Sequence, residues 1–264
     1  MTRVASAVVL VAVVGGVLWF GPWWATLLLA SVVGAIAAAE VAGLSRAIGA
    51  PVPTLVICSG AVVVCALVPI GMVSGEAMVA VLSALVLGAA LVTLAGGAPD
   101  PHTLTRAAVT IMTPLYIGLP LGSMVWIHLT VGPRALLFVI AVIALSDMAQ
   151  YWVGRSIGRR KLAPLVSPAK TFEGAQGGFV AALLIGIWLG PRWGQAASIT
   201  QGAALGGVLC LAGIMGDLFE SLLKRSAAVK DSGTLIPGHG GVLDRIDAYL
   251  FAVPVYLLFL RYFG

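Results

Sequence analysis

Long apolar segments separated by short polar ones make up most of this chain of 264 residues. A run of about 20 apolar residues is long enough to cross a bilayer as a helix. Nine segments fit, and we expect membrane-spanning helices near residues 4–20, 22–43, 51–72, 77–96, 106–128, 134–153, 174–192, 199–218 and 242–260. Only Gly21-Pro22 separates the first two, so they could form a tight hairpin or one bent, partly re-entrant element. The pattern predicts an all-α polytopic membrane protein.

Two polar stretches interrupt this pattern, one from Gly154 to Gly178 and one from Phe219 to Gly241. Together they carry eight basic residues: Arg155, Arg159, Arg160, Lys161, Lys170, Lys224, Arg225 and Lys230. Placing both stretches in the cytosol puts the N-terminus inside and the C-terminus outside. Of the 15 Lys and Arg residues, 12 then face the cytosol and three face outward, namely Arg134, Arg192 and Arg261. This distribution follows the positive-inside rule and supports the predicted topology.

The composition also indicates a membrane protein, because 60% of the residues are hydrophobic and only 9% are charged. An ordinary soluble domain has about 25% charged residues. The stretch from Val4 to Phe20 has the length of a signal-peptide core, but no small-x-small site and polar segment follow it, so we expect it to be retained. The three cysteines lie inside apolar runs without Cys-x-x-Cys spacing, and we expect them to be small buried hydrophobic residues.

The acidic residues divide the chain into two regions, since seven of the ten occur from Asp147 onward. We predict a scaffold of transmembrane helices over residues 1–130 and a catalytic region over residues 131–264, with cytosolic loops at 154–173 and 219–241. A polar catalytic cavity facing the cytosol is expected in this C-terminal half. Glu40, near the cytosolic end of the second predicted helix, is interpreted as a helix-end carboxylate and not as a site residue.

The residues from Gly216 to Asp247 form the main candidate site. Their spacing places two carboxylates, a hydroxyl and an ammonium group on one helix face, from Asp217, Glu220, Ser221 and Lys224. A turn-rich loop follows, and the next predicted helix begins with Asp244 and Asp247, three residues apart. Facing carboxylates at two helix ends are suitable ligands for Mg²⁺. The basic residues would bind phosphate oxygens, and the loop glycines would allow consecutive N–H groups to bind an anion: Lys224, Arg225, Lys230, Arg245, Gly238, Gly240 and Gly241.

Two aspartates stand out because each lies in, or at the edge of, an apolar run. An ionised carboxylate there costs at least ~2.5 kcal/mol on insertion scales. For Asp217 we expect a bound cation to compensate. Asp147 could do the same, or it could pair with Lys170 or Arg155 as a structural contact.

The first polar stretch leaves two interpretations open. Ser167-Pro168 and the residues after it are expected to form a turn that leads into the seventh helix. Ser167 or Thr171 could cap that helix, with Glu173 in its first turn. Alternatively, Ser167, Lys170 and Thr171 could surround a nucleotide phosphate. Basic residues at 159–161 are interpreted as topology signals and lipid-headgroup contacts.

A family resemblance becomes visible in the run from Ser221 to Asp247, which reads SLLKRSAAVKDSGTLIPGHGGVLDRID. These 27 residues resemble the complete motif of the CDP-diglyceride synthetase (phosphatidate cytidylyltransferase) family. The segments SPAKTFEG, from Ser167, and GDLFES, from Gly216, resemble two further blocks of that family. DMAQYWVG, from Asp147, resembles a paralogous branch more closely, because Gln150 stands where other members have small residues.

The resemblance implies a membrane fold of about nine helices and the reaction of CTP with phosphatidate to give CDP-diacylglycerol and pyrophosphate. It implies that Mg²⁺ is required and that Asp217 and Asp244 ligate a pair of cations, for which K⁺ is a candidate second ion. Asp231 and Asp247 would lie nearby. We further expect a catalytic role for Lys224 and His239 and substrate contacts from Ser167, Lys170, Thr171, Ser221, Arg225, Lys230, Gly240, Gly241 and Arg245.

The implied chemistry needs no serine or histidine nucleophile, because a phosphate monoester is already largely dianionic at neutral pH. The main obstacle is repulsion between two anions, which metal ions and basic residues reduce. The expected partners are CTP, a lipid phosphate and membrane lipids, with no nucleic acid, and two copies could form a homodimer. We expect an integral protein of the inner membrane with its active site facing the cytosol.

Three alternatives remain. The acceptor could be a different lipid phosphate, such as a modified or isoprenoid one. A transporter would also carry acidic residues in its membrane helices, but these acids cluster at one face in one half of the chain, and no inverted repeat is visible. The intact motif argues against an inactive scaffold.

Overall fold

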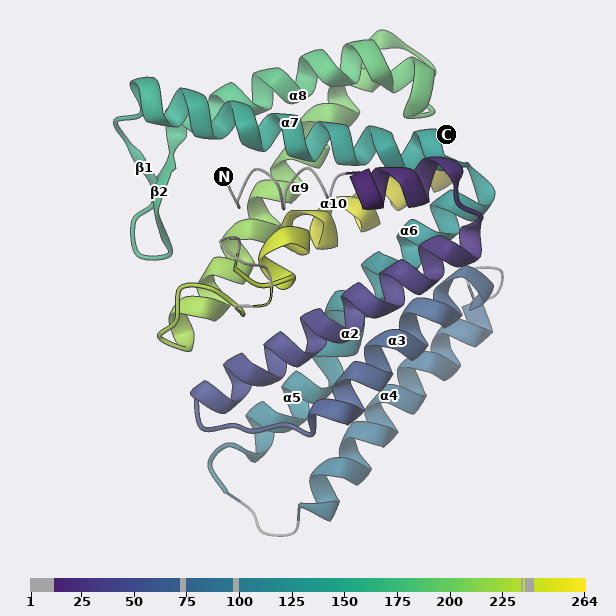
Figure 1. Ribbon diagram of the computed structural model, residues 1–264, viewed down its shortest axis with the longest axis vertical. Coiled ribbons are helices and arrows are strands. Elements are labelled where there is room, and N and C mark those ends of the chain that lie inside the picture. Colours follow the sequence, from purple (N-terminus) through teal and green to yellow (C-terminus); the bar gives the residue numbers. More distant parts are fainter. Residues whose placement is uncertain (1–11, 72–74, 97–99, 234, 236–239) are drawn as a thin grey trace. The chain divides into compact units, whose positions relative to one another are not determined.

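The computed structural model describes residues 12–264 except 72–74, 97–99, 234 and 236–239. The chain forms helices almost throughout (Figure 1). After a helical stretch at residues 12–20, the elements are α2 Trp23–Ala47, α3 Thr54–Gly71, α4 Gly75–Ala95, α5 Thr103–Thr113, η1 Pro114–Gly118, α6 Leu119–Thr130, α7 Pro133–Ile157, β1 Lys161–Ala163, β2 Ser167–Thr171, α8 Phe172–Trp193, α9 Ile199–Ser226 and α10 Leu243–Tyr262. Two compact units can be distinguished: Met1–Leu129 with Ser226–Arg245, and Thr130–Arg225 with Ile246–Gly264.

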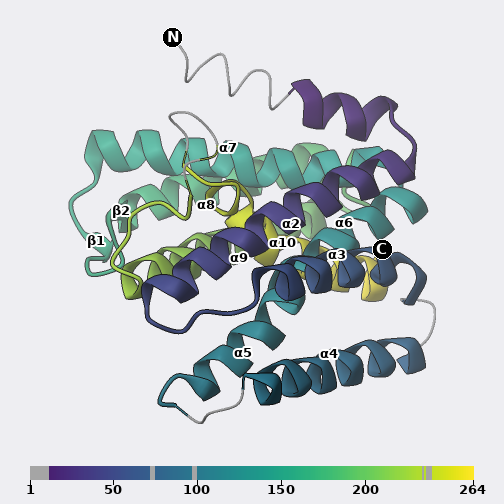
Figure 2. The ribbon, with the colours of Figure 1, turned by 60° about the horizontal axis from the view of Figure 1, so that its bottom comes forward.

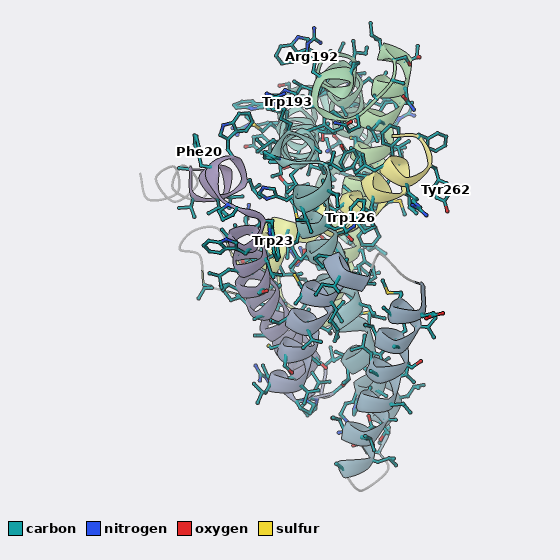
Figure 3. All side chains as sticks on the ribbon, turned by 90° about the vertical axis from the view of Figure 1, so that its right-hand side faces the viewer. Phe20, Trp23, Trp126, Arg192, Trp193 and Tyr262 are labelled. Carbon is teal, nitrogen blue, oxygen red and sulfur yellow. The ribbon has the colours of Figure 1, made fainter. Side chains whose placement is uncertain are left out.

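The helices confirm an all-α polytopic membrane protein. Within the described residues, six helices are long and apolar enough to cross a bilayer, and Thr54–Ile70 is a shorter apolar helix. Many large apolar side chains are exposed, including Phe20 and Trp23 on either side of the Gly21-Pro22 break (Figure 3). A soluble monomer seldom exposes so much apolar surface, whereas lipid-facing helices require it. Most of the first predicted helix, 4–20, lies outside the described residues.

In the first unit, α3 lies between α2 and α4 (Figure 2) and packs against both of them and against η1. The predicted helix at 106–128 is a longer helix, Thr103–Thr130, that contains the π-helical turn η1. Pro114 begins this turn, and a proline inside a helix removes one backbone donor and crowds the preceding turn. Inside the unit, the buried hydroxyl of Thr26 lies 2.6 Å from Nδ1 of His128.

In the second unit, α7 lies along α8, and the β1–β2 hairpin connects them at one end (Figure 1). Small residues allow α8 and α9 to approach closely, since a Cβ added at Gly186 would collide with the carbonyl group of Gly202. Close contact through small residues is the usual way in which helices pack in lipid. Arg192 and Trp193 end α8 (Figure 3), and the Arg192 guanidinium carbon lies 6.0 Å from the ring centroid of Trp188.

Two local features differ from the sequence-based expectations. The predicted turn at Ser167-Pro168 is instead part of strand β2, which pairs antiparallel with β1 in the register Lys161↔Thr171 and Ala163↔Ser167. Helix α9 also continues to Ser226, so the polar stretch that starts at Phe219 begins as helix. This extension confirms the helical spacing predicted for the residues from Asp217 to Lys224, because all of them lie on α9.

Candidate functional site

The chemistry-bearing residues lie in two clusters, one in each unit. The first, here called the Asp217 cluster, consists of Asp217 and Ser221 on α9, Lys170 on β2 and Asp247 on α10. Lys170 Nζ lies 2.5 Å from Asp217 Oδ2, and the two side chains are 18% and 30% exposed. Ser221 Oγ donates to Asp217 Oδ1 at 3.3 Å. One turn of α9 and the end of the hairpin therefore hold a carboxylate, a hydroxyl and an ammonium group together.

Asp247 joins this cluster through close packing of α9 against α10. A Cβ added at Gly216 would collide with the Asp247 carbonyl group, so the absence of a side chain next to Asp217 lets the Asp247 backbone approach. The Asp247 residue is only 9% exposed, and its Oδ1 accepts a hydrogen bond of 2.8 Å from the N–H of Ala248. A carboxylate this buried needs compensation by donors or a cation.

Lys224, expected to contact phosphate, is held by a neighbouring carboxylate. Its Nζ lies 2.5 Å from Oε2 of Glu220, and the two side chains are 11% and 0% exposed. The pair is thus buried within the second unit, where breaking a buried ion pair is usually destabilising. The adjacent Arg225 is exposed, and its Nε donates to the backbone carbonyl of Val166 at 3.2 Å. This bond ties the hairpin loop to the end of α9.

The second cluster, here called the Glu40 cluster, lies in the first unit and joins α2 to the segment before α10. Glu40 Oε1 accepts from the N–H of Val242, and Glu40 Oε2 accepts from the N–H of Leu243 and the hydroxyl of Ser232, each at 2.8 Å. Asp244 Oδ2 accepts from the N–H of Gly241 at 2.8 Å, the N–H of Ser232 at 3.1 Å and the Ser232 hydroxyl at 3.0 Å. The carboxylates of Glu40 and Asp244 therefore hold Ser232 and the backbone at residues 241–243 in place.

At the end of the loop that was predicted to bind an anion, consecutive backbone N–H groups donate to carboxylates of the chain itself. The N–H groups of Gly241, Val242 and Leu243 all donate to Asp244 or Glu40. Gly240 has a φ of +76°, a conformation that strongly favours glycine. Backbone N–H groups before a helix bind anions readily, which explains why both carboxylates gather there.

The remaining predicted site residues have various surroundings. Thr171 caps α8 by accepting from the N–H of Gly174 at 3.1 Å, which is one of the two roles left open for it. Ser167 is half-buried at the start of β2. Three further predicted site residues of the motif are exposed, namely Lys230, Asp231 and Arg245. His239 and Gly238 lie outside the described residues.

The structure also shows contacts of Glu40 and Lys170 that the sequence did not predict. Glu40, interpreted from sequence as a helix-end carboxylate, takes part in the second cluster; the signal that could have identified it is an acid inside an otherwise apolar helix. Lys170, one of the two partners considered for Asp147, pairs with Asp217. Arg155, the other, donates to the hydroxyl of Tyr151 at 2.8 Å.

The carboxylate oxygens of Asp217 and Asp247 are the type of ligand that Mg²⁺ prefers. Among the described residues, no group of three or more His, Cys, Asp or Glu side chains is close enough to enclose a metal ion. Mg²⁺ does not require such a cage, since it is usually bound by one or two carboxylates together with waters and substrate phosphates. The half-exposed Asp217 beside the buried Asp247 fits that mode of binding.

Comparison with known proteins places this sequence in a family. The model of the cytidylyltransferase family matches residues 1–263. The chain is 43% identical over 131 residues to "Uncharacterized protein YnbB" of Escherichia coli, covering 50% of this chain and 44% of the relative. It is 40% identical over 161 residues to the phosphatidate cytidylyltransferase of Synechocystis sp., covering 56% and 52%, and 42% identical over 137 residues to that of Haemophilus influenzae, covering 48% and 46%. These matches span about half the length of the curated relatives. Because the family model matches almost the whole chain, this protein belongs to the cytidylyltransferase family.

Proposed function

We propose that this protein transfers the cytidylyl group of CTP to phosphatidic acid, giving CDP-diacylglycerol and pyrophosphate for phospholipid synthesis. Two of the relatives above are named phosphatidate cytidylyltransferase, and the family match includes the whole motif. The observation that carries the proposal is the Asp217 cluster, where a carboxylate on a helix of a membrane protein meets the ammonium group of Lys170 on the β1–β2 hairpin. Binding of a lipid phosphate and a nucleoside triphosphate requires basic side chains for the phosphate oxygens and carboxylates that can hold a metal ion.

We propose Mg²⁺ as the cofactor and K⁺ as the second cation of a pair, with Asp217 and Asp244 as the ligands of these cations. Both aspartates offer carboxylate oxygens, which are the ligands that Mg²⁺ takes, and this supports the assignment. When bound, Mg²⁺ would neutralise charge that develops on the phosphate oxygens. Asp231 and Asp247 would add negative charge that favours cation binding.

The side chains of the protein would position two anions for reaction. The phosphate of phosphatidic acid is largely dianionic at neutral pH, so its oxygen can attack the α-phosphorus of CTP without a protein nucleophile. Lys170 and Arg225 would orient phosphate groups near α9, and Lys230 and Arg245 would stabilise the leaving pyrophosphate. Lys224 would contribute positive charge while Glu220 holds its position.

The location of the substrates supports a site at the cytosolic surface. CTP is a cytosolic molecule, and the phosphate of phosphatidic acid lies at the membrane interface. We therefore propose nine spanning helices in the inner membrane, with a polar cavity open to the cytosol in the C-terminal half. The Gly- and Ala-rich N-terminal helices suit close packing of two copies, which we propose as a homodimer.

A lipid-panel assay tests the proposed reaction. The full chain, purified in detergent, is incubated with radiolabelled CTP, Mg²⁺ and one of several lipid phosphates, including phosphatidic acid and an isoprenoid phosphate. We expect label in the lipid fraction and release of pyrophosphate with phosphatidic acid, and loss of both when EDTA removes the metal. A clear preference for a lipid without glycerol would change the acceptor, and no transfer to any lipid would reject the proposal.

A further inference from the structure

Glu40 lies on α2, yet its carboxylate binds a segment about 200 residues later in the chain. We propose that Glu40 is a positioning residue for cytidylyl transfer, which holds Ser232 and the backbone at residues 241–244 in the conformation that binds Mg²⁺ and CTP. This inference rests on the proposed function, because it assigns Glu40 a part in the same reaction. Glu40 would act through Asp244 without touching the substrate.

The Glu40 carboxylate lies at the beginning of α10. The first N–H groups of a helix have no acceptor within the helix. Glu40 accepts from the N–H of Leu243, the first residue of α10, and from the N–H of Val242, which precedes the helix. A carboxylate is favoured at this end of a helix because the helix dipole is positive there. Such a cap usually comes from the residue just before the helix, whereas here it comes from a different helix, α2.

The Ser232 hydroxyl links Glu40 to Asp244. The Ser232 hydroxyl lies 2.8 Å from Glu40 Oε2 and 3.0 Å from Asp244 Oδ2. A hydroxyl has one proton to donate, so it satisfies only one of these carboxylates at a time. The Ser232 N–H binds Asp244 as well, so a displacement of Ser232 would be felt directly at Asp244. Glu40 thus fixes both Ser232 and the backbone immediately before Asp244.

Two glycines of the motif, Gly233 and Gly241, leave room for the Glu40 side chain. A Cβ added at Gly241 would lie 2.6 Å from Glu40 Oε1, and one added at Gly233 would lie 2.9 Å from the Glu40 carboxyl carbon. Real Cβ atoms do not approach other atoms so closely, so a side chain at either glycine would displace Glu40. These two glycines of the C-terminal motif therefore make room for a carboxylate from the N-terminal region, and the motif is complete only when Glu40 is included.

A purely structural cap can be distinguished from a positioning residue by its effect on metal dependence. Loss of an ordinary cap lowers stability but leaves the metal requirement of the remaining folded protein unchanged. Loss of a group that orients a metal ligand typically reduces metal affinity or activity by 10–100-fold. The Mg²⁺ concentration needed for half-maximal transfer is therefore the informative quantity.

The test compares the full-length wild type with Glu40→Gln, Glu40→Asp and the control Glu76→Gln. In Glu40→Gln an NH₂ donor replaces one acceptor oxygen, so it opposes one of the N–H groups at 242–243. Glu40→Asp keeps the charge on a side chain that is one methylene shorter. Glu76, in the first turn of α4, is an exposed carboxylate of the same unit. For each variant, kcat, KM for CTP, the half-saturating Mg²⁺ concentration and amide hydrogen exchange at residues 241–243 are measured.

We expect Glu40→Gln to lower kcat/KM by about 10–100-fold and to raise the half-saturating Mg²⁺ concentration, with faster exchange at Val242 and Leu243. Glu40→Asp should recover part of each change, and Glu76→Gln should match the wild type. Faster exchange with unchanged kinetics and Mg²⁺ dependence would reduce Glu40 to a structural cap and overturn the inference, as would unchanged exchange. If the wild type itself transfers nothing, the proposed function fails; the exchange data then still show whether Glu40 holds the segment.

Discussion

The aspartates at residues 217 and 244 are surrounded by different kinds of hydrogen-bond donor. Asp217 faces the ammonium group of Lys170, whereas Asp244 Oδ2 is held by two backbone N–H groups and a hydroxyl. An asparagine at either position has nearly the same size and keeps one carbonyl oxygen as acceptor. Substitution with asparagine therefore removes the charge but preserves most of the local hydrogen bonds.

Because the substitution removes the charge of a proposed metal ligand, we expect Asp217→Asn and Asp244→Asn each to lower cytidylyl transfer by more than about 100-fold. This loss exceeds the usual effect of substituting a residue that only supports a ligand. The thermal unfolding midpoint in detergent should stay near that of the wild type. Arg159→Ala is the control, because the contact of Arg159 with Glu173 is made by its backbone N–H and survives the substitution. Near-wild-type turnover in either asparagine variant would contradict the metal assignment.

Sequence could identify the site residues whose partners are close in the chain. The helical spacing from Asp217 to Lys224 was sufficient to predict one face of α9, including the carboxylate and ammonium of Glu220 and Lys224. Sequence could not reveal Glu40, because its donors lie about 200 residues away and nothing local specifies them. The pairing of Lys170 with Asp217 also depends on packing between distant elements, although both residues were named as candidates.

Among the elements, the junction of the hairpin with α8 determines how one candidate loop is held. Thr171 ends β2 and is the N-cap of α8, and a Cβ at Gly158 would lie 2.7 Å from its hydroxyl. Long apolar runs made the helices predictable. The hairpin was missed because its strands are only three and five residues long and are not periodic in hydrophobicity. The π turn at Pro114 likewise depends on how the backbone adapts to a proline.

The Thr171 cap leads to a prediction about stability. Thr171→Ala should destabilise the protein by about 1 kcal/mol, the typical effect of losing a hydroxyl N-cap. The matched control is Ser156→Ala, since the exposed Ser156 hydroxyl donates only within its own helix, to the carbonyl of Trp152. Thermal unfolding in detergent should show a lower midpoint for Thr171→Ala than for the control. Equal midpoints would mean that the cap contributes little to stability.

For the whole molecule, the arrangement in the membrane follows from where the charges lie along the chain. With 12 of the 15 basic residues assigned to one side, the predicted topology places the β1–β2 hairpin in the cytosol and the segment after α8 on the opposite side. The two positions are separated by one apolar helix, Phe172–Trp193.

Single cysteines can test this topology in sealed vesicles of known orientation. We expect Lys161→Cys to react with a membrane-impermeant thiol reagent only from the cytosolic side, and Ser198→Cys only from the other side. Both positions are exposed, and the native cysteines lie inside apolar helices. Labelling of both cysteines from the same side would contradict the crossing of α8.

The contacts of Glu40 also have a consequence for synthesis of the chain. Glu40 and Val242 are 202 residues apart, so at about 5–20 residues per second the ribosome needs on the order of 10–40 s to produce the N–H groups that bind this carboxylate. During that interval α2 carries an acid whose final donors do not yet exist. Val242 and Leu243 can form these hydrogen bonds only after the helices from α2 to α9 have been synthesised, so this contact forms after those helices have entered the membrane.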